Sequence, residues 1–321
     1  MNCKTGKNSE NEKEIEKNIE LKNVYKEKRT AHYDIRPYED LRSDESGRCA
    51  NVYDISITSA IPLILIIWEV VKKGYKQINL NFFTETAPST LDAMLARNSG
   101  ELIPGGIANG ITGTLLMVVI ASLLAIPTGI LGGIYLSEKP KTWFSILIRF
   151  LTDLVQGSPS IVIGIIAYSW IVKPLGSYSA LAGSIALSIM MLPLIIRSTE
   201  ETLKMLPGSL KEAGLALGAS YTRVILKVLL PSAFGGLFTG ILLAISRVMG
   251  ETAPLMLTAL GSSAINWDIL KPTSAVPLLI WEFYNDPNLI DMIWSSSLFL
   301  LLLILLLNII AKQVARKWKI Q

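Results

Sequence analysis

Long runs of apolar residues separated by short polar segments fill the chain from residue 55 onward. Several of these runs match or exceed the ~20 residues that a helix needs to cross a bilayer. Six spans can be marked, at 55–71, 107–136, 145–172, 180–196, from 228 towards 260, and at 289–314. The pattern predicts an all-α integral membrane protein whose six transmembrane helices form one domain over 54–321.

Three of these spans contain residues that bend or interrupt a helix. The second has 30 residues, roughly 45 Å of helix against ~30 Å of hydrocarbon, and Pro127 predicts a bend. Gly250 and Pro254 predict a break in the fifth span. In the third, Gln156 to Ser160 form a polar interruption with two open interpretations. It is a simple kink, or it is a buried helix start, capped by Ser158, whose free N–H groups face an anion.

The composition supports the membrane class and sets the N-terminus apart. Half of the 321 residues are hydrophobic and the mean hydropathy is +0.44. Residues 1–53 instead hold 11 Lys/Arg and 11 Asp/Glu, which predicts a hydrophilic extension, disordered or loosely helical, rather than a signal peptide. Cys3, Cys49 and His32 lie in this extension, and their spacing indicates neither a disulfide framework nor a metal site.

Basic residues predict the orientation in the cytoplasmic membrane. They gather in the loops after the second and fourth spans and at the C-terminus: Lys139, Lys141, Arg149, Arg197, Lys204, Lys211, Arg223, Lys227, Lys312, Arg316, Lys317 and Lys319. By the positive-inside rule these segments are cytoplasmic, and an even number of spans then places both termini on that side. Lys72, Lys73 and Lys76 oppose this assignment and are expected to snorkel at the outer interface.

The polar loop over 197–231 contains the signals of a short helix outside the membrane. Ser209 and Glu212 have the spacing of a capping box, and Pro207 and Gly208 end the preceding element. Gly218 can adopt the left-handed conformation that stops a helix. Such a helix suits docking into a groove on a partner; the alternative is a surface helix that only seals the bilayer edge.

Charged residues inside apolar segments are the candidates for transport chemistry. Arg247 and Glu251 lie four residues apart, hence on one helical face. They form an internal ion pair, or Arg247 supplies bidentate donors to a passing anion while Glu251 weakens its grip. Arg149 and Asp153, also four apart, are predicted to pair at the interface.

Two motifs resemble a known family. The loop Glu212-Ala213-Gly214, followed by Gly218 and Leu-Leu-Pro231, resembles the EAA loop of ABC-importer permeases. The run Arg247-Val-Met-Gly-Glu-Thr-Ala-Pro-Leu255 resembles the signature of PstA-type permeases of the phosphate ABC importer, whose sister permease typically reads Gly-Glu-Thr-Met. Segments 157–164, 191–201 and 215–220 agree, and the resemblance covers about 55 to the C-terminus.

The resemblance implies a permease subunit that moves inorganic phosphate. It also implies a sister permease, two ATP-binding subunits and an extracytoplasmic phosphate-binding protein. The expected coupling residues are Ser209, Glu212, Ala213, Gly214 and Gly218. The family's membrane-embedded charges fall on Arg197, Glu200 and Arg247, although Arg197 also suits a pair with Glu201 or a simple boundary residue. The expected substrate path comprises Arg247, Glu251, Arg197, Glu200, Ser158 and Ser160.

Other classes of function are disfavoured by missing motifs. The chain has no Gly-x-x-x-x-Gly-Lys-Ser/Thr run, so ATP and magnesium belong to a partner subunit and no cofactor or metal is expected here. The spans hold no histidine and no nucleophile–base set, which argues against a membrane-embedded enzyme. Lipid is the expected surrounding, and no nucleic-acid partner is indicated. A permease for another oxyanion, such as molybdate, and a non-transporting scaffold are the remaining alternatives.

Overall fold

The computed structural model describes residue 58 and residues 60–317, with the side chain of Lys317 left out. The hydrophilic extension over 1–53, with Cys3, Cys49 and His32, lies outside the described residues. The chain divides into two units, Met1–Ile66 and Ile67–Gln321. The described residues of the first unit, 58 and 60–66, are helical. The architecture below concerns the second unit.

Helices account for nearly all regular structure in the described part. From residue 80 onward they are, in chain order, α3 (Leu80–Thr84), α4 (Thr90–Ser99), α5 (Ala108–Glu138), α6 (Trp143–Gly157), α7 (Ser160–Ala167), the π-helical η1 (Tyr168–Val172), α8 (Lys173–Leu175), α9 (Ala180–Lys204), α10 (Gly208–Ala216), α11 (Tyr221–Val224), the π-helical η2 (Ile225–Leu229), α12 (Leu230–Val248), α13 (Ala253–Thr258), α14 (Val276–Tyr284), the 3-10 helix η3 (Pro287–Leu289) and α15 (Ile290–Lys317). The prediction of an all-α protein is confirmed for these residues.

Four helical segments are long and apolar enough to cross a membrane. They are Ala108–Glu138, Ala180–Lys204, Tyr221–Val248 and Pro287–Arg316. A fifth is formed by Trp143–Gly157 together with Ser160–Leu175 if the bent pair counts as one span. The described part therefore contains four to five spans, which correspond to the second through sixth spans predicted from the sequence.

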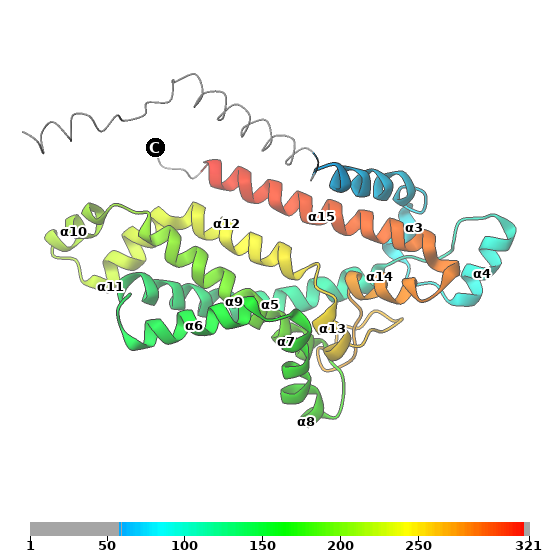
Figure 1. Cartoon of the computed structure of the whole chain (residues 1–321), viewed down its shortest axis with the longest axis horizontal. Coiled ribbons are helices and arrows are strands. Elements are labelled where there is room, and N and C mark those ends of the chain that lie inside the picture. The colour runs from blue at the N-terminus through cyan, green and yellow to red at the C-terminus, as the bar shows by residue number, and fades with distance from the viewer. Residues whose placement is uncertain (1–57, 59, 318–321) are drawn as a thin grey trace, which may run out of the picture. The chain divides into compact units, whose positions relative to one another are not determined.

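The interruption in the third span is a sharp break rather than a kink. The axis of α6 and that of the segment Ser160–Leu175, which begins with α7 and ends with α8, differ by 107°, so α7 and α8 turn away from the line of α6 (Figure 1). The predicted cap is wrong, because the Ser158 hydroxyl donates to the Leu154 carbonyl 2.7 Å away and so closes α6. Pro159 is the N-cap of α7, and Ser160 is its first residue.

The predicted break in the fifth span is confirmed, whereas α5 runs without interruption through Pro127. The fifth span stops at Val248 and resumes at Ala253, with Pro254 in the first turn of α13. Proline suits this position because a first-turn N–H has no partner within the helix. The fourth span continues beyond its expected end to Lys204, so Arg197 and Glu200 lie on α9 rather than in a loop.

Glycines allow α5, α9 and α12 to pack side by side (Figure 1). A Cβ atom on Gly129 of α5 would lie 2.7 Å from Cγ2 of Ile195 on α9. On a neighbouring face of α9, Ser198 and Thr202 meet Gly240 and Gly236 of α12. Such small-residue contacts are the usual way for membrane helices to approach closely, because lipid provides no hydrophobic drive for association. The main core, around Met117, Leu187, Met191 and Leu255, lies against these helices.

The predicted extramembrane helix exists as α10, but its capping box does not form. The helix begins at Gly208 with Pro207 as its N-cap, so Ser209 is already inside the first turn and cannot act as a cap. The C-terminal prediction is confirmed, since Gly218 has φ +77°. Gly218 N–H donates to the Leu215 carbonyl and Ala219 N–H to the Gly214 carbonyl, the bond pattern of a Schellman motif.

Candidate functional site

A small polar cavity lies at the break between α6 and α7. Its volume is about 130 Å³, and its lining includes Gln156, Ser158 and Ser160 from the broken span. Arg247, from the last turn of α12, and Glu251, from the α12–α13 break, line it as well. Four of the six substrate-path residues predicted from the sequence therefore meet in one place. Gln156 completes the polar lining and was not among the predicted residues.

Arg247 and Glu251 form a loose ion pair in this cavity. The Arg247 Nε and Glu251 Oε1 atoms are 3.9 Å apart, and the two side chains are 44% and 19% exposed. The helix ends between them, but Gly250 N–H donates to the Arg247 carbonyl and Glu251 N–H to the Val248 carbonyl, which keeps the turn tight. At this separation Glu251 does not hold the guanidinium in a close bidentate pair, so its paired N–H donors remain available to another acceptor.

Close packing of α7 on α13 fixes the position of α7 beside the cavity. A Cβ atom on Gly164 of α7 would lie 2.8 Å from Cα of Pro254 on α13. Ser160 begins α7 four residues earlier, and Glu251 lies two residues before the start of α13. The contact between the two short helices therefore sets the distance between the α7 N-terminus and the Arg247–Glu251 pair.

Arg197 and Glu200 lie outside this cavity, in ion pairs between α9 and α6. Arg149 Nη2 is 2.5 Å from Glu200 Oε1, and Lys204 Nζ is 2.6 Å from the same oxygen. Arg197 pairs with Asp153. The predicted Arg149–Asp153 pair and the suggested Arg197–Glu201 pair are both wrong. The reason is that α6 and α9 pack together, so each charge finds a closer partner on the facing helix than along its own.

The predicted coupling residues lie on an exposed helix. Ser209, Glu212, Ala213 and Gly218 are exposed, whereas Gly214 faces α11, where a Cβ atom would lie 3.0 Å from Cγ2 of Val224. Apolar side chains beside them are exposed as well, with Met205 at 76% and Leu217 at 88%. Exposed apolar groups on an otherwise charged surface are typical of a docking site for a partner.

Three residues at this surface form a cluster that the sequence did not reveal, although Lys211 was expected among the basic residues of this loop. Glu138, the last residue of α5, accepts hydrogen bonds from Lys211 Nζ on α10 and from the Tyr221 hydroxyl on α11. The partners are 73 and 83 residues away in the chain. No local spacing pattern signals a contact across such distances.

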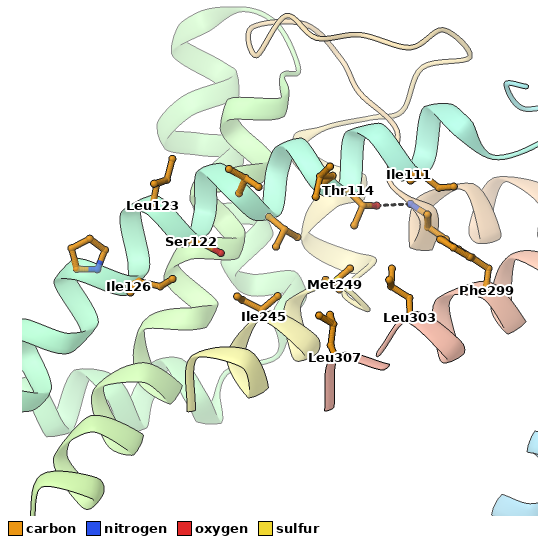
Figure 2. A pocket seen from close by; sticks show the side chains of 15 residues that line it. Ile111, Thr114, Ser122, Leu123, Ile126, Ile245, Met249, Phe299, Leu303 and Leu307 are labelled. Atoms are coloured by element: carbon orange, nitrogen blue, oxygen red, sulfur yellow. Dashed lines mark hydrogen bonds between the residues drawn. The ribbon is translucent and has the colours of Figure 1, made fainter. Parts of the chain in front are cut away.

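A second and larger hollow is apolar. Figure 2 shows Leu123 and Ile126 of α5 and Leu303 and Leu307 of α15 around it, and its volume is about 620 Å³. Thr114 Oγ1 accepts from the Val276 N–H at 2.9 Å, and the Ser122 hydroxyl has no hydrogen-bond partner among the described residues. Its lining residues carry no charge. Because transfer of a charged group to an apolar site is costly, this hollow is no path for an anion.

Residue 58 and residues 60–317 offer no metal site. Within them, no three His, Cys, Asp or Glu side chains gather closely enough to hold an ion.

Comparison with known proteins places the chain in a class and then in a family. Residues 125–320 match the family model described as "Binding-protein-dependent transport system inner membrane component". The Yersinia pestis phosphate transport system permease protein PstA is 38% identical over 260 residues, which cover 80% of this chain and 85% of the relative. A probable PstA of Methanocaldococcus jannaschii is 34% identical over 78% of this chain and 86% of its own length.

Solved structures agree on the fold. A chain of the MetNI methionine ABC transporter, in an inward-facing conformation, matches with a TM-score of 0.55 at 21% identity, over 66% of this chain and 95% of that chain. The helices and spans thus define a multi-pass inner-membrane permease of the ABC type rather than an enzyme. The chain belongs to the family of binding-protein-dependent transport system inner membrane components, in the branch that contains the PstA permeases.

Proposed function

We propose that this chain is the permease subunit of an ATP-driven importer that moves inorganic phosphate across the cytoplasmic membrane. The observation that carries the proposal is the polar cavity at the broken span, where Arg247, Glu251, Ser158 and Ser160 meet. The names of the curated relatives, which are phosphate transport permeases, support phosphate as the cargo.

The chemistry of the cavity suits a tetrahedral oxyanion in transit. A guanidinium offers paired N–H donors that match phosphate oxygens, and the first-turn N–H groups of α7 favour negative charge. Ser160 adds a hydroxyl, while the Ser158 hydroxyl must first leave the Leu154 carbonyl to donate. Glu251, 3.9 Å from Arg247, offsets part of the positive charge. A weak site serves transport because the anion must leave as readily as it enters.

Arg197 and Glu200 would act at the cytoplasmic end of this path. Each is held to α6, through Asp153 and Arg149 respectively. A phosphate leaving between α6 and α9 would compete with the carboxylates for the two guanidinium groups. This arrangement supports a role in passage for Arg197 and Glu200, although neither lines the cavity.

The exposed helix α10 would determine how the importer complex assembles. Helix α10, with Ser209, Glu212, Ala213, Gly214 and Gly218, would dock on one of two ATP-binding subunits, which hold ATP and magnesium. A sister permease would complete the path, and an extracytoplasmic binding protein would deliver phosphate. The topology we propose has six spans, the first at about 55–71, with both termini and the extension over 1–53 in the cytoplasm.

The test is ATP-dependent uptake into proteoliposomes that hold this chain with its sister permease, the ATP-binding subunits and the binding protein. Wild type is compared with Arg247→Gln, Arg247→Lys and the control Arg316→Gln, which removes an exposed arginine at the end of α15. We expect Arg247→Gln to abolish phosphate uptake while assembly and ATP hydrolysis persist. Arg247→Lys keeps the charge without the paired donors and should retain partial uptake.

Two outcomes would contradict the proposal. Equal uptake by wild type and Arg247→Gln would reduce Arg247 to one half of an internal ion pair. Transport of molybdate without phosphate by the assembled wild type would favour a permease for another oxyanion.

A further inference from the structure

The cytoplasmic end of α5 is tied to the coupling helix through one carboxylate. Glu138 is the last residue of α5, and its side chain is only 12% exposed. It accepts hydrogen bonds from the ammonium of Lys211 on α10 and from the hydroxyl of Tyr221 on α11. The two donors also contact each other, since Lys211 Nζ lies 3.3 Å from the Tyr221 oxygen and 4.8 Å from the centre of its ring.

The position of Glu138 is unfavourable for α5 taken alone. A carboxylate at the C-terminus of a helix lies at the negative end of the helix dipole, where a cation would be favoured. The ammonium of Lys211 compensates for this charge, and the hydrogen bond to Glu138 raises the pKa of Lys211. The charge at the end of α5 is therefore balanced by the coupling helix and not by α5 itself.

Helices α10 and α11 form a compact pair on the other side of this contact. The Schellman turn at Gly218 joins them, and Gly214 packs on Val224. A displacement of α10 therefore carries α11 with it, so Lys211 and Tyr221 move together. Both hold the same carboxylate, which means that the movement is passed to the end of α5.

Helix α5 can carry such a movement into the membrane. Its glycines, Gly129 and Gly133, pack directly against Ile195 and Thr199 of α9. Helix α9 in turn contacts α6 and α7, which line the polar cavity, and itself adds Met190, Pro193 and Leu194 to that lining. The contacts form a continuous route from the docking surface to the cavity.

We propose that Glu138, Lys211 and Tyr221 form a positioning cluster that transmits displacement of the coupling helix to α5 and so sets how much phosphate moves per ATP hydrolysed. This inference rests on the proposed function, because it assumes that an ATP-binding subunit moves α10. The three residues do not line the polar cavity, so we expect their effect to be on coupling and not on phosphate binding or ATP hydrolysis.

The experiment measures the ratio of phosphate transported to ATP hydrolysed in proteoliposomes holding the whole complex. The variants are Glu138→Gln, Lys211→Met and Tyr221→Phe, with Lys141→Met as control because it removes an exposed lysine just beyond α5. Each cluster variant is expected to lower the ratio, by roughly two- to thirty-fold for the two charged positions, while basal ATP hydrolysis stays within the control range. The double variant Glu138→Lys with Lys211→Glu is expected to recover much of the ratio, which a generally weakened fold would not.

The outcomes separate this inference from the proposed function. An unchanged ratio in all three cluster variants, or an equal loss in Lys141→Met, would overturn the positioning role. If the charged variants fail to assemble, Tyr221→Phe decides alone, since it removes one hydroxyl and keeps the ring over Lys211. If wild type carries molybdate and not phosphate, the proposed function fails, and the same ratio measured with molybdate still tests the cluster.

Discussion

Replacing Gly164 by alanine is expected to push α7 away from α13 and to lower the stability of the protein. The new Cβ would lie 2.8 Å from Cα of Pro254, 3.3 Å from Cδ1 of Leu257 and 3.4 Å from Cβ of Pro254. Leu257 can rotate, but Cα of Pro254 is a backbone atom and cannot leave the site without moving α13. Two carbon atoms are best separated by about 3.5–4.0 Å, so the helices must part by roughly 0.7–1.2 Å.

The expected cost is modest because two effects oppose each other. Overpacking of a tight contact costs about 1–3 kcal/mol. Alanine in place of glycine inside a helix returns about 0.5–1 kcal/mol. The net loss is then about 1 kcal/mol, near the middle of the resulting range. Transport should suffer more than stability, because Ser160, at the start of α7, and Glu251, two residues before α13, line the same cavity.

The assay compares thermal unfolding of the purified complex in detergent with phosphate uptake in proteoliposomes. Gly157→Ala is the matched control, since a Cβ on Gly157, the last residue of α6, meets open space. We expect Gly157→Ala to unfold at or slightly above the wild-type temperature and Gly164→Ala to unfold below it with reduced uptake. If Gly164→Ala matched Gly157→Ala in stability and wild type in uptake, the close α7–α13 contact would not be what shapes the cavity.

Two further predictions concern α10 and α14. Gly218→Ala places a side chain at φ +77°, a conformation that costs an L-residue about 1–2 kcal/mol, so the C-terminal end of α10 should fray and transport per ATP should fall. The control Gly208→Ala, at the open start of α10, should leave the helix and the transport ratio intact. Equal behaviour of the two variants would contradict a role for the Schellman turn. On α14, burial raises the pKa of Glu282 above its ordinary 4.5, so ionisation is penalised in the folded state and stability declines as pH rises from about that value through the raised pKa. Glu282→Gln should therefore unfold at a higher temperature than wild type at neutral pH and lose this advantage below about pH 4.5 in a pH series of melting curves; an advantage that is constant with pH would contradict the burial argument.

Local signals were sufficient for much of this protein. Apolar runs predicted the second through sixth spans, because burial in lipid demands long uninterrupted helices. The break before Pro254 and the left-handed end at Gly218 were readable because proline and glycine act on their own backbone. The proximity of Arg247 and Glu251 was readable as well, since four residues of chain bring two side chains together. The motifs that resemble ABC-importer permeases indicated which kind of transporter this is, whereas the hydrophobic and charge patterns alone did not.

Contacts between distant segments were decided only by the tertiary structure. Arg149 and Asp153 share a helical face, yet each pairs across to α9, because packing of α6 on α9 offers a closer partner. Ser158 closes α6 instead of opening α7, since the 107° turn places the start of the second helix beyond it. The Glu138 cluster joins residues up to 83 positions apart. Helix periodicity determines which side chains share a face of one helix. Which other helix packs against that face depends on how whole helices pack together, and this packing exists only in the assembled fold.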